Sequence, residues 1–144
     1  MIEFEYEEDR MFFDNLFEEI GGVELYAELF DFSDPSIKRE AFNKIRNQVF
    51  EDLRNEYGDV CMLKYHDDCN NSAEQVDHLI PLSSNVLNKS LRNMKGEKGK
   101  KVATQSFGSN QKMNFVLACA RCNSAKKHRI PDAKLLARCV GGNS

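Results

Sequence analysis

The stretches VDHLIPLSS, residues 76–84, and NFVLACARCNSAKK, residues 114–127, contain the pattern that decides the fold. Val76–Leu82 and Phe115–Ala118 are short apolar runs, which predict two strands. Arg121 to about Lys127 is expected to form a helix after the second strand. The order strand, long loop, strand, helix predicts a small α+β unit.

Four cysteines flank these stretches in two pairs. Cys119 and Cys122 form a CxxC pair, whose turn brings two thiolates within reach of one ion, and zinc accepts four such ligands tetrahedrally. Cys61 and Cys69 are separated by seven residues, a wider gap than usual, and His66 is an alternative ligand in place of either. We expect a structural Zn²⁺ with no open position for water. Four buried cysteines without a metal are the plainer alternative.

The residues between and after the cysteine pairs form an ordered arrangement. It consists of a DH pair followed by apolar residues and Pro, an Asn ahead of the CxxC, a second Asn directly after it, and a Lys. These positions are Asp77, His78, Pro81, Asn114, Cys119, Cys122, Asn123 and Lys126. The arrangement resembles the HNH nuclease family over about residues 61–130. The last family position is Asn123 rather than histidine, a variant that relatives also carry.

The resemblance implies a ββα-metal core in which Asp77 and Asn123 bind one divalent ion, with His128 as an alternative ligand. It further implies that His78 is the general base and that Asn114 holds the loop and the orientation of the histidine. Carboxylate and amide oxygens suit Mg²⁺ or Mn²⁺. Neutral imidazole can take a proton from water near neutral pH. The expected reaction is hydrolysis of DNA phosphodiester bonds to 5′-phosphate and 3′-hydroxyl ends, as in restriction, phage defence or a mobile element, with RNA as an alternative substrate.

Each of these residues also has a plainer interpretation. Adjacent residues of a strand point to opposite faces unless the backbone twists, so Asp77 and His78 taken alone are a satisfied polar pair. Asn114 and Asn123 taken alone are turn caps. The competing hypotheses are therefore a non-catalytic, zinc-stapled module that binds nucleic acid, and a structural or inhibitory protein. Because one HNH site cleaves one strand, cutting both requires two events or two copies, such as a homodimer.

Charge is distributed unevenly around a net charge of −3. Residues 1–34 carry twelve acidic residues and one basic residue, a net charge of −11. Residues 85–144 carry thirteen basic and two acidic residues, a net charge of +11. Residues 1–34, called the acidic arm below, should repel phosphates. The arm has three interpretations: a contact with a protein partner, a self-contact with the basic surface, or a source of solubility.

The basic charge lies on the insertion at residues 85–113 and around the expected catalytic helix. Beside a nuclease site, such residues are expected to contact the nucleic-acid backbone, although a charge run is often only a solvated face. The predicted contacts are Lys98, Lys100, Lys101, Arg121, Lys126, Lys127, His128 and Arg129. Phe107, in the turn TQSFGSN, is expected to anchor the insertion rather than stack on a base.

Helices are predicted at both ends of the chain. Residues 8–30 should form two short helices with a break at Gly21 and Gly22, and residues 35–57 one amphipathic helix capped by Asp34. The apolar stripe of that helix is Ile37, Ala41, Ile45, Val49, Leu53 and Tyr57. A last helix is predicted from Pro131 to Val140, ended by Gly141 and Gly142, with Cys139 in the core. The predicted domains are an acidic helical extension, residues 1–58, and an HNH nuclease domain, residues 59–144.

The composition is that of a globular protein, with 41% hydrophobic and 30% charged residues. Apolar runs are too short to span a bilayer, and the acidic start lacks the basic residues of a secretory signal. We therefore expect a cytoplasmic location, no membrane contact and reduced thiols.

Overall fold

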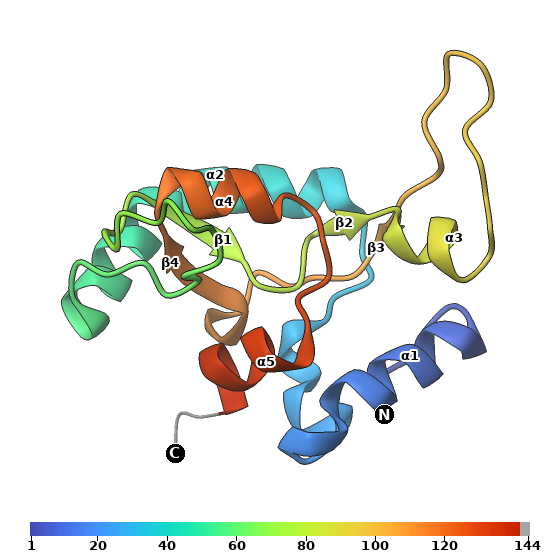
Figure 1. Ribbon diagram of the computed structural model, residues 1–144, viewed down its shortest axis with the longest axis horizontal. Coiled ribbons are helices and arrows are strands. Elements are labelled where there is room, and N and C mark those ends of the chain that lie inside the picture. Colours follow the sequence, from blue (N-terminus) through green and yellow to red (C-terminus); the bar gives the residue numbers. More distant parts are fainter. Residues whose placement is uncertain (142–144) are drawn as a thin grey trace.

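The computed structural model describes residues 1–141 as a mixed α+β protein whose central element is a two-stranded antiparallel sheet (Figure 1). Strand β1, Gln75–His78, pairs with β4, Phe115–Ala118, so that Gln75 lies opposite Ala118. Helix α4, Ala120–Lys126, follows β4, and α2, Pro35–Tyr57, packs against both strands. The order strand, insertion, strand, helix agrees with the prediction.

The two faces of this sheet carry different side chains because successive residues of a strand point to opposite sides. On one face, Phe115 and Leu117 form a buried cluster with Phe42 and Leu53 of α2. On the other face, Val116 and Ala118 join the larger buried cluster, which includes Cys119 and Cys122. The sheet is therefore enclosed by α2 on one side and by α4 with the cysteines on the other.

Strand β1 is shorter than predicted, because it ends at His78 instead of continuing to Leu82. The side-chain amide of Asn114 hydrogen-bonds to the N–H and to the carbonyl oxygen of Ile80, which are therefore not paired with a strand, and Pro81 has no N–H to pair. The chain resumes as β2, Ser83–Ser84, which pairs with β3, Gln105–Ser106, in a second small sheet. Gly108 passes so close to this turn that a Cβ there would lie 2.0 Å from the Ile80 carbonyl oxygen.

Helix α2 has the predicted bounds. Asp34 caps it by accepting hydrogen bonds from the N–H groups of Ser36 and Ile37. Its predicted apolar stripe is partly wrong, since Ile37 is 66% exposed and Ile45 is 42% exposed. The buried face is instead formed by Lys38, Phe42 and Leu53.

Helix α2 buries the face that carries Lys38 and Phe42 because both side chains have partners in the interior. The Phe42 ring lies 4.5 Å from the His78 ring and 5.3 Å from the Phe115 ring, measured between centroids. The buried ammonium of Lys38 donates to the carbonyl oxygens of Asp31 and Gly108, both at 2.6 Å, and to Ser106 Oγ at 2.7 Å. Because these oxygens satisfy its ammonium, Lys38 can occupy a position on the buried face of α2 that an apolar residue would otherwise hold.

The N-terminal elements confirm a break at Gly21 and Gly22, whose φ angles are +106° and +96°. Before the break lie α1, Glu7–Phe17, and the short 3-10 helix η1, Glu18–Ile20. The second predicted helix is a kinked 3-10 segment, η2, Val23–Leu29.

The later helices differ from the prediction at their ends. Helix α4 begins at Ala120, one residue early, because the sulfur of Cys119 caps it by accepting from the Cys122 N–H. The last predicted helix begins at Ala133 rather than Pro131, because Asp132 caps α5, Ala133–Leu136, and it continues as the π-helical turn η4, Ala137–Gly141. Gly142 lies outside the described residues. Cys139 is buried, as predicted.

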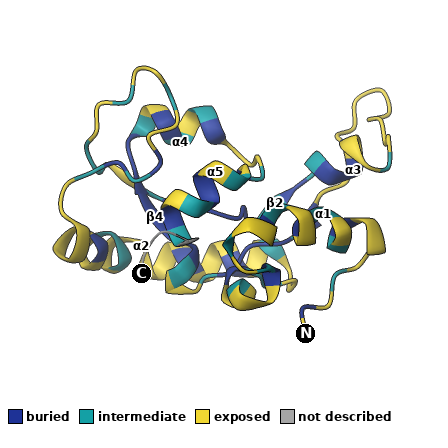
Figure 2. Ribbon diagram, turned by 60° about the horizontal axis from the view of Figure 1, so that its bottom comes forward, coloured by how far each residue is buried: buried dark blue, intermediate teal, exposed yellow. Residues whose placement is uncertain are grey.

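The larger buried cluster joins distant parts of the chain. Figure 2 shows where buried residues, in dark blue, lie along the ribbon. Phe13 and Phe17 of α1 pack in it together with Leu63 and Leu79 from beyond residue 58. Phe107 is 2% exposed and lies 5.5 Å from the Phe13 ring, so it anchors the insertion as expected. Within residues 1–141, no helix has both the length and the apolar character required to cross a membrane.

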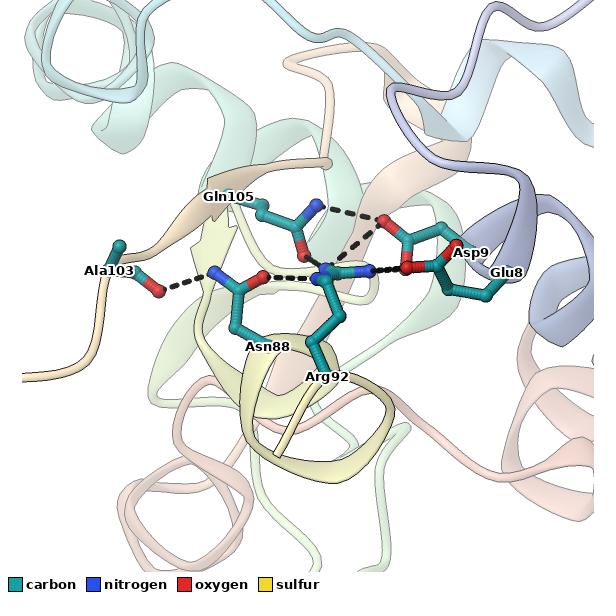
Figure 3. A network of polar contacts seen from close by, with 6 residues as sticks. All are labelled: Glu8, Asp9, Asn88, Arg92, Ala103 and Gln105. Atoms are coloured by element: carbon teal, nitrogen blue, oxygen red, sulfur yellow. Dashed lines mark hydrogen bonds and ion pairs between the residues drawn. The ribbon is translucent and has the colours of Figure 1, made fainter. Parts of the chain in front are cut away.

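The acidic arm is tied to the base of the insertion by a polar network (Figure 3). Arg92, which follows helix α3, Val86–Ser90, lies with its Nη1 atom 2.8 Å from Asp9 Oδ1 and 3.0 Å from Glu8 Oε1. Gln105 donates to Asp9 Oδ2 at 2.8 Å and accepts from Arg92 at 2.6 Å. Asn88 accepts from Arg92 Nε. The contact anchors the insertion where it leaves the body.

Replacing Asp9 with alanine should lower the free energy of unfolding by about 3 kcal/mol, because it leaves Arg92 without its buried partner. Asp9 is 1% exposed, whereas the neighbouring Glu8 lies at the surface. Urea denaturation followed by circular dichroism measures the change, with Glu8→Ala as the matched control. Equal losses in the two variants would contradict the role assigned to the buried pair.

Candidate active site and metal centre

The four cysteines predicted as ligands lie together. The sulfur atoms of Cys61, Cys69, Cys119 and Cys122 are all within 4.8 Å of one another, and three of these residues are buried. A group of four thiols at this spacing could hold a metal ion such as zinc. The imidazole of His66 lies outside the group and accepts a hydrogen bond from the Asp68 N–H. The alternative with His66 as ligand is therefore not favoured.

Backbone N–H groups surround the sulfur atoms, which explains how the wide Cys61–Cys69 spacing is accommodated. The intervening loop bends back so that the N–H groups of Tyr65 and His66 donate to Cys122 Sγ, at 3.3 and 3.4 Å. Burial alone would raise the pKa of the Cys119 thiol, but N–H donors, including that of Cys122, and neighbouring thiols lower it to about 7. Thiolate character is what a metal ligand requires.

A cleft of about 680 Å³ lies between α2 and α4, with residues 74–78 of the β1 region in its lining. Strand β1 pairs only with β4 in its sheet, so its other edge is free. The predicted site residues Asp77, His78, Asn123 and His128 all line this cleft. Residues from β1 and from α4 are thus brought to one place although 45 positions separate His78 from Asn123.

Asp77 is buried, and its carboxylate forms an ion pair with Lys126 of α4, with 3.0 Å between Oδ2 and Nζ. This pair lacks hydrogen-bond geometry, so Asp77 Oδ2 accepts no hydrogen bond from the described residues. Burial raises the pKa of Asp77, and Lys126 opposes that rise. The cation that faces this buried oxygen is the ammonium of Lys126.

The prediction that Lys126 contacts nucleic acid is wrong. Its side chain is 1% exposed, and Nζ also donates to the His78 carbonyl oxygen at 3.1 Å. Lys126 therefore stabilises the turn after β1 and balances the charge of Asp77. It cannot reach a phosphate at the surface.

His78 points to the opposite face of β1 from Asp77, toward the rings of Phe42 and Phe115. Its Nε2 lies 2.8 Å from Asn110 Oδ1, and Asn110 Nδ2 donates to the Lys38 carbonyl oxygen at 2.8 Å. Because a carbonyl only accepts, this second bond orients the amide and places the proton of His78 on Nε2. Nδ1 then carries the free lone pair.

Burial of His78 lowers its pKa to about 4, assisted by the nearby cations Lys126, Lys38 and Arg39, although the bond to Asn110 favours the charged form. The ring is therefore neutral at pH 7 and is able to accept a proton.

Asn114 is fully buried, and its side chain hydrogen-bonds to Ile80 and Ser109 rather than to His78. Its Oδ1 accepts from the Ile80 N–H at 2.7 Å, and its Nδ2 donates to the carbonyl oxygens of Ile80 and Ser109, both at 2.9 Å. These bonds hold the loop after β1 to the turn before β4. The part of the prediction in which Asn114 orients the histidine is corrected, because Asn110 makes that contact.

Asn123 is half-buried on α4, and its amide nitrogen donates to Gln75 Oε1 on β1 at 2.5 Å. The described residues bring no other group of three or more His, Cys, Asp or Glu side chains close enough to share an ion besides the four cysteines. A divalent ion between Asp77 and Asn123 would therefore complete its coordination with water and substrate oxygens, as Mg²⁺ often does.

The remaining predicted nucleic-acid contacts lie in three places. Lys127 and His128 line the cleft. Lys98, Lys100 and Lys101 are exposed on the loop between α3 and β3 that projects from the body in Figure 1. Arg121 and Arg129 are exposed around α4.

Sequence reasoning missed three residues of this site: Asn110, Arg39 and Arg46. The two arginines line the cleft from α2. Both arginines lie at exposed positions of an amphipathic helix, so the sequence does not distinguish them from other surface cations. Asn110 lies in a stretch with the composition of an ordinary turn. Comparison with known proteins adds no relative: no family model matches the chain, and neither a curated protein nor a solved structure matches it.

Proposed function

We propose that this chain is a metal-dependent endonuclease of the HNH type, with a ββα-metal core formed by β1, β4 and α4. The observation that carries the proposal is that Asp77, His78 and Asn123, which match the family pattern in order, line one cleft. The four-cysteine cluster beside it is proposed to bind structural Zn²⁺.

The residues support a division of roles. The carboxylate of Asp77 and the amide oxygen of Asn123 would hold Mg²⁺ or Mn²⁺, which would neutralise charge on the phosphate and the leaving oxygen. Nδ1 of His78 would take the proton of the attacking water, since Nε2 is committed to Asn110. Burial raises the pKa of Asp77, and the ion pair with Lys126 favours the charged carboxylate against that rise.

A non-catalytic nucleic-acid binding module is the second candidate. The observation that favours it is the buried pair of Asp77 and Lys126, because a lysine already balances the carboxylate charge that a metal would otherwise balance. The two candidates differ in whether phosphodiester bonds break.

The test is incubation of the full chain with supercoiled plasmid, circular single-stranded DNA and single-stranded RNA, each with Mg²⁺, with Mn²⁺ or with EDTA. We expect nicking or fragmentation with at least one metal and none with EDTA. DNA ligase should reseal nicks if the ends are 5′-phosphate and 3′-hydroxyl. Intact substrates under every metal condition would reject the endonuclease in favour of the binding module.

A further inference from the structure

We propose that the cleft binds a single, unpaired nucleic-acid strand, and that Arg39 and Arg46 of α2 bind its phosphates. The inference rests on the proposed function for the statement that the ligand is a nucleic acid. It adds that this nucleic acid is single-stranded and that α2 forms one wall of its binding site. Residues 1–58 carry most of the acidic charge, yet one helix of this part lines the cleft with basic groups.

The walls of the cleft carry basic side chains that are free to bind an anion. Arg39 and Arg46 lie on α2, and Lys127 and His128 lie at the end of α4 and just beyond it. Within residues 1–141 none of the four forms an ion pair with a carboxylate. The guanidinium of Arg46 donates to Asn43 Oδ1 and lies 5.6 Å from the centroid of the Phe42 ring.

Of the two acidic residues in the lining, Asp77 is offset by a cation, whereas Glu74 keeps its negative charge and only has neutral hydrogen-bond donors. Glu74 Oε1 accepts from Asn70 Nδ2 at 2.8 Å and from the Ala120 N–H at 3.2 Å. Asp77 is paired with Lys126. An incoming phosphate therefore meets free cations on both walls.

The spacing of the two arginines fits a nucleic-acid backbone. They are seven residues apart, which places them on one face of α2 at a separation of about 10 Å along the axis. A stacked strand carries a phosphate roughly every 3.4 Å, so this separation spans about three phosphates. Phe42, whose ring contacts His78, lies between them in the sequence. Phosphates held by the arginines would therefore lie on either side of His78.

The size and shape of the cleft favour one strand over two. Its volume of about 680 Å³ lies in the range of pockets that enclose a single small ligand. Arg39 and Arg46 line this cleft from α2, and Lys127 and His128 line it from the end of α4, so one strand within it can contact basic groups of both walls. Half-buried Phe50 adds an aromatic ring to the lining, and the Arg54 guanidinium lies 5.4 Å from its centroid, so a base stacking there would displace Arg54 or stack beside it. A basic groove with an aromatic ring is typical of single-strand binding sites.

The experiment is fluorescence anisotropy in EDTA with a short labelled DNA strand, an RNA strand and a hairpin duplex of the same sequence. The variant is Arg39→Gln with Arg46→Gln, and the control is Lys44→Gln, an exposed cation on α2 outside the cleft lining. We expect the DNA strand to bind at least about tenfold tighter than the duplex. The double variant should lose that advantage, and its salt slope should fall by about 1.4, or about 0.7 for each lost phosphate contact.

Equal or tighter binding of the duplex would overturn the inference, as would an equal loss in the Lys44 control. Tighter binding of RNA than of DNA would keep the site and assign the sugar. Because the assay contains EDTA, it does not depend on cleavage. Strand binding through the arginines without cleavage in the substrate panel would reject the nuclease alone, whereas cleavage without a preference for single strands would reject this inference alone.

Discussion

Replacing Cys122 with serine should abolish metal retention and leave the chain largely unfolded at ordinary temperature. Cys122 is fully buried, and its sulfur accepts N–H donors from the loop that carries Cys61 and Cys69. Structural zinc sites contribute about 10–16 kcal/mol of binding free energy to folding. A typical domain is stable by only about 5–15 kcal/mol, so the loss of the site exceeds what the fold can absorb.

The measurement is zinc content after exhaustive dialysis together with thermal unfolding by circular dichroism. Cys139→Ser is the matched control, since Cys139 is also buried but is not among the four clustered cysteines. The control should retain one zinc per chain with a modest loss of stability. A metal-free wild type that unfolds at the same temperature as Cys122→Ser would mean that the four cysteines are simply buried thiols.

The second large effect is expected at His78, whose replacement by alanine should slow cleavage by about a hundred- to ten-thousandfold. The loss should appear in the rate of single-turnover cleavage under saturating enzyme, because binding by the cleft cations does not need the imidazole. Asn110→Ala should cause a smaller loss, since it removes the acceptor that sets the tautomer but leaves the base in place. An unchanged rate in His78→Ala would remove the histidine from the mechanism.

The pH profile gives an independent readout of the same residue. The pKa of His78 is lowered to about 4 by burial and by nearby cations, and a general base works only above its pKa. The value of kcat/KM, which reports on the free enzyme, should therefore stay high at pH values below about 6.5, the ordinary pKa of histidine. It should decline only as the pH approaches 4. In Asn110→Ala this decline should move to lower pH, because the bond to Asn110 favours the charged form of His78. The control His66→Gln changes a histidine outside the cleft and should leave the profile unchanged.

Features with local causes could be predicted from the sequence. Helix α2 begins and ends as expected because Asp34, Pro35 and Gly58 are sufficient signals for its ends. Strand β4 and the four clustered cysteines likewise follow from short patterns. The end of β1 could not be predicted, because it depends on Asn114, which is distant in sequence.

The candidate site divides in the same way. Asp77, His78 and Asn123 could be found because their order is itself a pattern. Arg39 and Arg46 could not, since nothing in the sequence says which exposed face of α2 turns toward the cleft. That rotation is decided by Phe42 and by Lys38, whose oxygen partners come from residues up to 70 positions away.

The packing of α2 against β1 and β4 also bears on how this chain could be divided or transplanted. Phe115 and Leu117 rely on Phe42 and Leu53 for cover, so a fragment that started after residue 58 would expose an apolar sheet face to solvent. The unit that can be moved between proteins as a functional cassette should therefore include α2. In evolutionary terms, the helix and the ββα segment would be inherited together rather than exchanged separately.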